Sequence, residues 1–209
     1  MNRKNHHRKA VPGARPLFLE QDHSRNANRL LLGISAIMFM LCSFSPHAAH
    51  AEKSGLPVLY PAPEFNGLSN WMNSDPVHSM KDLRGKVVLI DFWTYSCINC
   101  IHTLPYVKKW HGKYANKGLV VIGVHAPEFD FEKIPKNVVQ AVKDYEIRYP
   151  VALDNGFSLW RAYKNRYWPA LYLIDSDGMV RFMHFGEGRY AETEAAIVEL
   201  LQARGKPSQ

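Results

Sequence analysis

The spacing of apolar residues changes at about residue 96. Residues 87–93 (VVLIDFW) form a nearly unbroken apolar run that is rich in β-branched side chains, and such a run predicts a buried strand. From residue 97 to residue 115 the apolar positions, among them Ile101, Leu104 and Val107, recur every three or four residues. This spacing predicts a helix with one apolar face. The chain is therefore expected to pass directly from a buried strand into a helix.

The same alternation continues to residue 203. Further strands are predicted at 119–125, 149–153, 170–174 and 179–185, and further helices at 135–145, around 159–163 and at 191–203. Asp175-Ser176-Asp177-Gly178, between the last two strands, is typical of a hairpin turn. The order β-α-β-α-β-α-β-β-α predicts an α/β fold with a central mixed β-sheet flanked by helices on both faces.

The segments at either end have a different composition. Residues 52–73 are rich in Pro, Gly and Asn, and we expect an N-terminal tether there with at most one short strand. Residues 74–204 hold the periodic segments and are expected to form one domain, and residues 205–209 a tail. A chain of about 158 residues after residue 51 is long enough for a single domain with its own core.

The first 51 residues have the pattern of an export signal. Residues 1–29 are basic, an apolar run of about 15 residues follows, and Ala49-His50-Ala51 is a small-x-small site. This order predicts a signal peptide that is cleaved after Ala51, which would place the protein in the periplasm or outside the cell. The alternative is an uncleaved anchor through residues 30–45, although that run is shorter than the roughly 20 residues that span a bilayer.

The basic charge belongs to this leader. The whole chain has 26 basic and 19 acidic residues and a formal net charge of +7. Residues 1–51 hold seven of the basic and two of the acidic residues, so residues 52–209 keep 19 and 17, a net charge of +2. The charge therefore serves export and orientation, and it gives no support for nucleic-acid binding.

Two cysteines follow the predicted strand and form a C-x-x-C pair. Cys97 and Cys100 fall in the first turn of the predicted helix, where residues at i and i+3 share a face and can form a disulfide. The free N–H groups and the positive end of the helix dipole lower the pKa of a thiol at that position. Cys97 is therefore the expected nucleophile and Cys100 the resolving thiol of a dithiol that exchanges disulfides with other proteins.

One acidic residue interrupts the buried strand. Asp91 stands among apolar neighbours, so burial should raise its pKa. A carboxyl group behind Cys100 could take the proton of that thiol when a mixed disulfide resolves. The alternative place for Asp91 is a solvent-facing strand end.

These features together resemble the thioredoxin superfamily, and within it the exported TlpA/ResA-type thiol:disulfide oxidoreductases and the soluble domain of DipZ-like proteins. The resemblance covers roughly residues 57–203. It rests on the stretch VVLIDFWTYSCINC, on Asp91 six residues before Cys97, on Pro105 eight residues after Cys97, on Trp168-Pro169 before the strand at 170–174, and on the segment between His125 and Pro150. The last segment matches the extra central helix of the TlpA-like branch.

The resemblance implies roles for residues outside the dithiol. Pro169 would be cis and would present the backbone of Trp168 to a substrate chain. Trp93 and Tyr95, with Trp168, are expected to line an apolar surface around the thiols where an extended peptide docks, the protein core being the alternative place for each. Glu128, near the sheet edge that carries the thiols, is a weaker candidate, for a role in tuning a thiol pKa.

The resemblance also implies partners. Clients would be disulfide-bearing proteins, as in cytochrome c maturation or related metalloprotein assembly. Electrons would come from a membrane thiol donor, and no metal or cofactor beyond the Cys97–Cys100 disulfide is expected. Asn99 departs from both the proline of reducing loops and the histidine of oxidising loops, so an oxidant or isomerase stays open.

Other functions for the two cysteines fit the sequence less well. With His102 they spell C-x-x-C-x-H, but structural zinc needs four ligands, and haem attachment needs histidine directly after Cys100. A redoxin-type peroxidase would carry Pro-x-x-x-Thr/Ser-x-x-Cys, and this chain lacks that proline. A copper chaperone on this fold usually spaces its cysteines by three residues.

Overall fold

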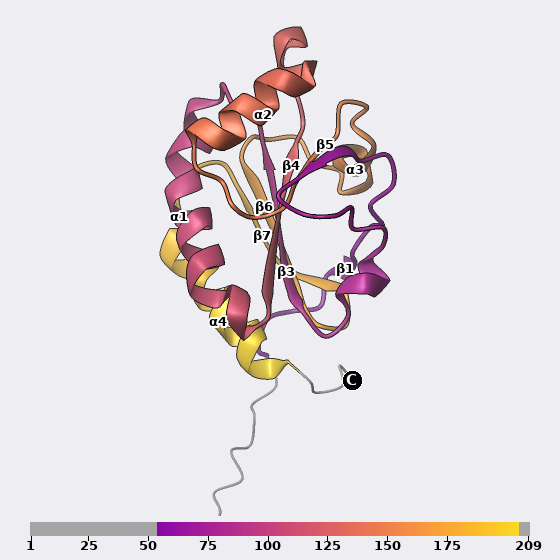
Figure 1. Cartoon of the computed structure of the whole chain (residues 1–209). Helices are drawn as coiled ribbons and strands as arrows, with labels where there is room; N and C mark the ends of the chain where they lie inside the picture. The colour runs from indigo at the N-terminus through magenta and orange to yellow at the C-terminus, as the bar shows by residue number, and fades with distance from the viewer. Residues whose placement is uncertain (1–53, 205–209) are drawn as a thin grey trace, which may run out of the picture. The chain divides into compact units, whose positions relative to one another are not determined.

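The computed structural model describes residues 54–204, which form a mixed seven-stranded sheet in the order β1-β7-β6-β3-β4-β5-β2 (Figure 1). The strands are β1 (Tyr60–Pro61), β2 (Ser69–Met72), β3 (Val87–Trp93), β4 (Leu119–His125), β5 (Val151–Leu153), β6 (Ala170–Ile174) and β7 (Met179–Phe185). The helices are α1 (Ile98–Tyr114), α2 (Pro135–Asp144), α3 (Ser158–Ala162) and α4 (Tyr190–Ala203), with short 3₁₀ turns η1 (Met80–Leu83), η2 (Ala115–Lys117) and η3 (Asp130–Lys133).

Strand β3 lies at the centre of the sheet. It pairs in parallel with β4 and antiparallel with β6, and every one of its residues is buried. Because successive side chains of a strand point to opposite faces, its odd-numbered residues Val87, Leu89 and Trp93 join one core cluster and its even-numbered residues join the other. A strand buried on both faces explains why its sequence is an apolar run and not an alternation.

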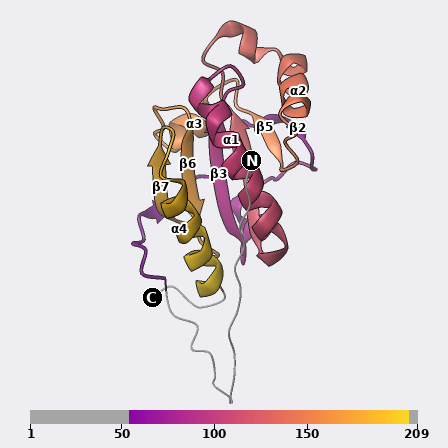
Figure 2. The ribbon, with the colours of Figure 1, turned by 90° about the vertical axis from the view of Figure 1, so that its left-hand side faces the viewer.

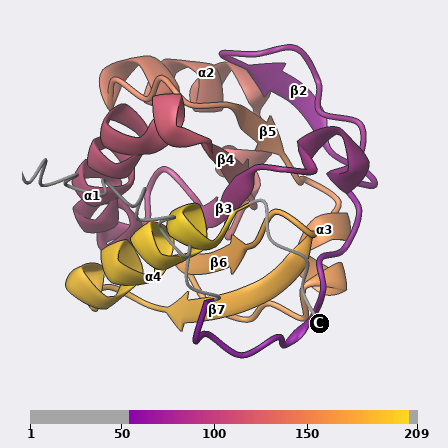
Figure 3. The same ribbon diagram turned by 90° about the horizontal axis from the view of Figure 1, so that it is seen from below.

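Helices cover both faces of the sheet, as predicted. Side chains of α1, α2 and α4 pack in one cluster with the odd-numbered face of β3, and α3 and η1 pack against the even-numbered face. Figures 2 and 3 show α1 and α4 side by side over the same face. Helix α2 follows η3 between β4 and β5, which confirms the expected central helix.

Residues 54–73, which were expected to form a tether, are part of the β-sheet. Instead of one short strand they form two, β1 beside β7 and β2 beside β5, at the two opposite edges of the sheet. The buried guanidinium of Arg181 donates to the carbonyls of Leu56 and Pro57 and forms an ion pair with Asp175 at 2.7 Å. Long-range pairing with existing strand edges therefore orders this segment despite its Pro and Gly content.

The predicted signal peptide, its cleavage site after Ala51, the alternative anchor at 30–45 and the tail at 205–209 lie outside the described residues. Within residues 54–204, no helix is both long enough and apolar enough to cross a membrane.

Candidate active site

The two cysteines lie at the junction between β3 and α1, at the edge of the sheet where the parallel strands β3, β4 and β5 end. Cys97 is the N-cap of α1, and its Sγ accepts a hydrogen bond from the backbone N–H of Cys100 at 3.4 Å. Both are free thiols. Cys97 is half-buried, whereas Cys100 is 1% exposed, so an incoming disulfide can reach only Cys97.

The environments of the two sulfurs separate their pKa values. The Cys100 thiol, donating a hydrogen bond, and then the backbone N–H groups of Cys100 and Asn99 lower the pKa of Cys97 to about 6, against opposing burial. Burial raises the pKa of Cys100, and its hydrogen bond to Cys97 adds to that rise. At neutral pH these opposite shifts favour the thiolate form of Cys97 and the protonated form of Cys100.

Asp91 lies in the interior below the thiols. It is 1% exposed, and its Oδ1 has no hydrogen-bond partner among residues 54–204. Burial first, and then the charge of Cys97, raise the pKa of Asp91 to about 7. The Asp91 charge in turn adds to the rise in the pKa of Cys100, after burial and the hydrogen bond to Cys97.

The loop before β6, which contains Trp168 and Pro169, also lies near this edge of the sheet. The Trp168–Pro169 peptide bond is cis, which confirms the predicted isomer. Pro169 is buried, and its carbonyl accepts a hydrogen bond from the Gly186 N–H at 2.8 Å. Trp168 is half-buried, donates from Nε1 to the Ala126 carbonyl at 2.9 Å, and packs on Trp160 with ring centroids 4.2 Å apart.

Comparison with known proteins assigns this arrangement to a family. The AhpC/TSA family matches residues 58–183. The chain belongs to the AhpC/TSA family. Protein DipZ of Mycobacterium bovis is 47% identical over 171 residues, which are 80% of this chain and 24% of DipZ. The thiol-disulfide oxidoreductase ResA of Bacillus cereus is 29% identical over 177 residues, which are 83% of this chain and 97% of ResA.

A solved structure confirms the fold of this AhpC/TSA-family chain. A thiol-disulfide isomerase from Corynebacterium glutamicum superposes with a TM-score of 0.59 at 26% identity, covering 70% of this chain and 97% of that one. The fold is therefore thioredoxin-like, as the sequence resemblance implied. The chain spans about a quarter of the length of DipZ, so the similarity to DipZ concerns one part of a longer protein.

The expectation that Trp93 lines a docking surface is wrong. Trp93 is fully buried in the cluster beneath α1, with its ring edge-on to His125 at 5.4 Å. The physical reason is that β3 is the central strand and is covered on both faces, and Trp93 lies on its α1-facing side with Leu89. Trp93 therefore shapes the interior next to Cys100 and cannot touch a client.

Tyr95 takes a different position from Trp93. It is half-buried, stacks on His125 with centroids 5.6 Å apart, and donates from its hydroxyl to the Phe131 carbonyl at 3.1 Å. His125 is fully buried, and its Nε2 lies 3.2 Å from the hydroxyl of Thr94. Burial lowers the pKa of His125 to about 4, so the ring is neutral and has a structural role beneath Tyr95.

Glu132 in η3 is a site residue that sequence reasoning missed. Its carboxylate is fully buried and accepts from the Ser96 hydroxyl at 2.6 Å and from the backbone N–H groups of Glu128 and Phe129 at 2.6 and 3.0 Å. Burial opposes its ionisation, but these hydrogen bonds hold the pKa of Glu132 below its usual value. Glu132 thereby fastens the segment before α2 to the residue that precedes Cys97.

Glu128 itself is exposed. Its charge raises the pKa of Cys97, but this effect is smaller than those of the hydrogen bonds and of burial. His102, the third potential metal ligand of the C-x-x-C-x-H spacing, is exposed, with Nδ1 3.2 Å from a Glu187 carboxylate oxygen. Among the described residues, no three His, Cys, Asp or Glu side chains gather as metal ligands would.

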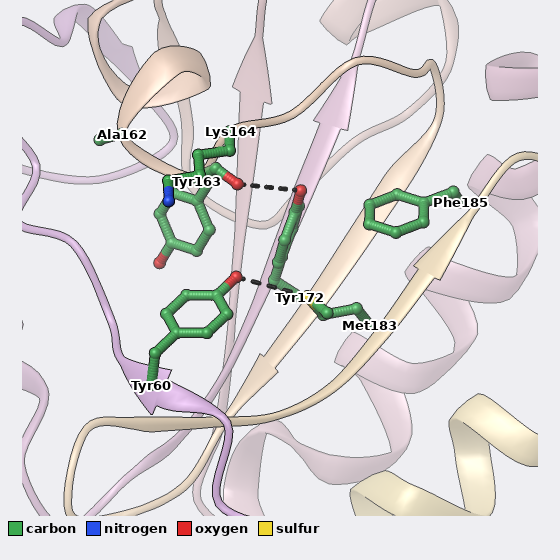
Figure 4. A pocket seen from close by; sticks show the side chains of 7 residues that line it. All are labelled: Tyr60, Ala162, Tyr163, Lys164, Tyr172, Met183 and Phe185. Atoms are coloured by element: carbon green, nitrogen blue, oxygen red, sulfur yellow. Dashed lines mark hydrogen bonds between the residues drawn. The ribbon is translucent and has the colours of Figure 1, made fainter.

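A cavity of about 450 Å³ lies on the other side of the sheet, between β1, β6, β7 and the segment after α3 (Figure 4). In it, the Tyr60 hydroxyl donates to Met183 Sδ at 3.3 Å, and the Tyr172 hydroxyl donates to Asn165 Oδ1 at 3.2 Å. Tyr163 is 3% exposed, and its hydroxyl bonds to no described residue. These side chains belong to the cluster opposite α1, so the cavity is separate from the thiols.

Proposed function

We propose that this protein is an exported thiol:disulfide oxidoreductase that reduces disulfides in partner proteins through Cys97 and Cys100. One observation carries the proposal: a half-exposed thiol with a pKa near 6 lies against a buried thiol whose pKa burial raises. Such a pair divides the work of a disulfide exchange between an attacking and a resolving sulfur. The chain also matches 97% of the length of ResA, which is named a thiol-disulfide oxidoreductase, and this similarity supports the same activity.

The reaction would proceed in two exchanges. The Cys97 thiolate attacks one sulfur of the client disulfide, the client S–S bond breaks, and the released client thiolate takes a proton from solvent. Cys100 then passes its proton to Asp91 and attacks the Cys97 sulfur. The bond between Cys97 and the client breaks, and the second client thiolate takes a proton from solvent, which leaves a Cys97–Cys100 disulfide and a client dithiol. Two electrons pass from protein to client, and the protein needs no cofactor for this step.

The client would bind beside the thiols against the exposed parts of Tyr95 and Trp168, with Pro169 behind them. The reduced dithiol must be regenerated, and in an oxidising compartment a membrane thiol donor would supply the electrons. Clients in cytochrome c maturation or related metalloprotein assembly follow from the TlpA/ResA resemblance. These partners, like export itself, are part of the proposal.

The equilibrium reduction potential of the Cys97–Cys100 pair tests the direction of the reaction. It would be measured in graded glutathione or dithiothreitol buffers, with Cys97→Ala as the control that cannot form the disulfide. A value near −270 mV, roughly that of thioredoxin, supports a reductant, and one near about −120 mV indicates a disulfide donor or isomerase instead. Absence of a reversible two-electron transition, together with consumption of hydrogen peroxide, would replace the proposal with a thiol peroxidase.

A further inference from the structure

Strand β7 is covered by another strand over only part of its outer side. β1 pairs with Met179 and Val180, at the amino end of β7, and the Leu59 N–H donates to the Val180 carbonyl at 2.9 Å. Among residues 54–204, no strand pairs with the outer side of residues 182–185. Figure 3 shows β7 along the outer margin of the sheet. The carboxyl half of β7 is therefore an open edge.

The pairing with β6 shows which backbone groups point outward from this open edge. The Gly186 N–H donates to the Pro169 carbonyl at 2.8 Å, and Phe185 pairs with Ala170. Because the backbone groups of an antiparallel strand point alternately to its two sides, Met183 and Phe185 direct their N–H and C=O groups outward. No described residue hydrogen-bonds to these four groups. Such groups are a template for pairing with another extended chain.

The open half of β7 is also the half that lies nearest the thiols. Phe185 pairs with Ala170, and Ala170 pairs with Phe92 near the end of β3. Cys97 follows β3 as the N-cap of α1. Neighbouring strands lie about 4.8 Å apart, so a strand added to β7 would lie three spacings, roughly 14 Å, from β3. An extended chain rises about 3.3 Å per residue, so about five residues of a bound chain would cover that distance.

The cavity of about 450 Å³ lies along the same stretch of β7. Met183 and Phe185 line it together with Tyr60 and Tyr172, and Figure 4 shows these side chains on one side of the sheet. Phe185 is 43% exposed, and its ring centroid lies 5.6 Å from that of Tyr167, which is 55% exposed. A strand on the open edge would place alternate side chains on this face. An apolar or aromatic side chain would meet rings and a thioether there.

We propose that the open edge of β7 binds an extended segment of a client protein as an added strand, with one apolar side chain of that segment in the cavity. The inference rests on the proposed function, because the client is the protein whose disulfide Cys97 attacks. The segment lies about five residues from the attacked cysteine and has no proline at the paired positions, where N–H groups are needed. A segment that is free to pair in this way belongs to an unfolded client.

A second copy of this chain fits the edge less well than a client does. Two β7 edges would pair about a two-fold axis, which would bring the cavities of both copies to one face of the joint sheet. The exposed Lys164 lines each cavity, so two like charges would lie on that face and oppose the pairing. A client segment brings no second Lys164.

The test holds a client peptide on the full chain. A synthetic peptide with one cysteine and, about five residues away, the segment Val-Phe-Val is joined by a disulfide to Cys97 of the Cys100→Ala variant, which cannot release it. Amide hydrogen exchange is then measured by NMR at Met183 and Phe185. The amides of Phe182 and His184 are internal references, because they face β6. The control peptide has the same side chains but is N-methylated at the three residues of the segment.

We expect the amides of Met183 and Phe185 to exchange at least about tenfold more slowly in the conjugate than in the free protein, since pairing protects exposed backbone groups. The reference amides should be unchanged, and the N-methylated peptide should give no protection. Absence of protection, or equal protection by the N-methylated peptide, would overturn the proposal. Protection in the free protein that grows with protein concentration would overturn it in favour of a second copy.

A second measurement tests the side-chain contact in the cavity. The same peptide with serine in place of its cysteine is bound to the reduced protein and followed by fluorescence anisotropy. Phe185→Lys should weaken binding by about two- to tenfold, the range that one aromatic contact supplies. Val139→Lys is the matched control, because Val139 is 37% exposed on α2, and it should bind as wild type does. Equal weakening in both variants would overturn the contact.

The cysteine-free peptide also separates the edge site from the proposed function. If it protects the Met183 and Phe185 amides while wild type reduces no disulfide-bonded peptide, the dithiol mechanism fails and the edge site stands. If wild type reduces such a peptide while neither amide is protected, the mechanism stands and the edge site is overturned.

Discussion

The backbone N–H of Cys100 donates a hydrogen bond to the sulfur of Cys97 over 3.4 Å, and the Cys100 thiol donates to the same sulfur. One cysteine therefore stabilises the thiolate of the other before any disulfide forms. The first residues of α1 supply both donors because Cys97 is the N-cap of that helix. The reactivity of Cys97 is thus a property of the pair and of the helix start together.

This relationship fixes the pH dependence of alkylation. The reaction of Cys97 with iodoacetamide should follow a midpoint near pH 6, against about 8.5 for an ordinary thiol. Cys100→Ala removes the thiol donor but keeps the backbone N–H, so its midpoint should lie between these two values. Stopped-flow alkylation of the reduced protein measures both midpoints, and a wild-type midpoint above pH 8 would contradict the assignment.

Asp91→Asn should make the reduced protein more stable at neutral pH. The unfolded chain releases the Asp91 proton near pH 3.8, whereas the folded protein holds it until about pH 7. The folded state therefore binds more protons between these values, and wild-type stability falls as the pH rises through this window. Urea unfolding at pH 7.5 should show a gain of at least about 1 kcal/mol in Asp91→Asn, a fraction of the roughly 1.4 kcal/mol per pH unit that linkage sets.

The same variant should be slower in catalysis, because Cys100 loses its proton acceptor. The rate at which Cys100 cleaves a mixed disulfide between Cys97 and a client peptide at pH 7.5 is expected to fall by about 10²-fold. A variant that is less stable than wild type at pH 7.5, or that releases the peptide at the wild-type rate, would show that the Asp91 carboxyl does not serve in this way.

Glu132→Ala should destabilise the protein far more than the neighbouring change Glu128→Ala. It leaves the backbone N–H groups of Glu128 and Phe129 and the Ser96 hydroxyl without their acceptor, at a cost of about 2–4 kcal/mol. Glu128 is exposed, and its removal should cost within about 0.5 kcal/mol. Chemical denaturation at pH 7 compares the two, and equal effects would contradict the role of Glu132.

The Glu132 contribution should also depend on pH. Its folded pKa lies below the ordinary value of 4.5, so the stabilisation is present above pH 4.5 and is lost as the pH falls below that value. The difference between wild type and Glu132→Ala should therefore shrink between pH 5 and pH 3, and a constant difference would show that the charge is not involved.

Gly123→Ala should disturb the interior behind Cys100. The added Cβ would lie 3.1 Å from Trp93 Nε1 and 3.2 Å from Val151 Cγ2, and such overpacking costs about 1–3 kcal/mol. Gly112→Ala is the control, because its Cβ would meet no atom within 4 Å and alanine in a helix gains about 0.5–1 kcal/mol over glycine. Thermal unfolding should shift downward for the first change and upward for the second.

The sequence predicts the inner strands of this protein well. The bounds expected for 87–93, 119–125, 170–174 and 179–185 are those of β3, β4, β6 and β7, because buried strands leave apolar runs between turn residues. The order of these elements also predicts helices on both faces. The edge strands β1 and β2 escape this reasoning, since they are two and four residues long and exist through pairing with distant strands.

Some residues of the candidate site can likewise be predicted from the sequence, and others cannot. Local patterns identify Cys97, Cys100 and Asp91, because the strand-to-helix junction and an acid in an apolar run are visible in the sequence. Glu132 looks like a surface acid in a polar segment, and only the fold brings Ser96 to it. The nearly unbroken apolar run that ends at Trp93 could have placed it in the interior, because such a run indicates a strand buried on both faces, but its position next to the thiols suggested a surface role.

The contacts at the start of the described chain fix where the polypeptide enters the domain. Ser54 and Leu56 hydrogen-bond to Glu199, near the carboxyl end of α4, whereas Cys97 lies at the amino end of α1. The two places are at opposite ends of the sheet (Figure 1). The described chain therefore enters the domain at the end of the sheet opposite the one that carries the thiols.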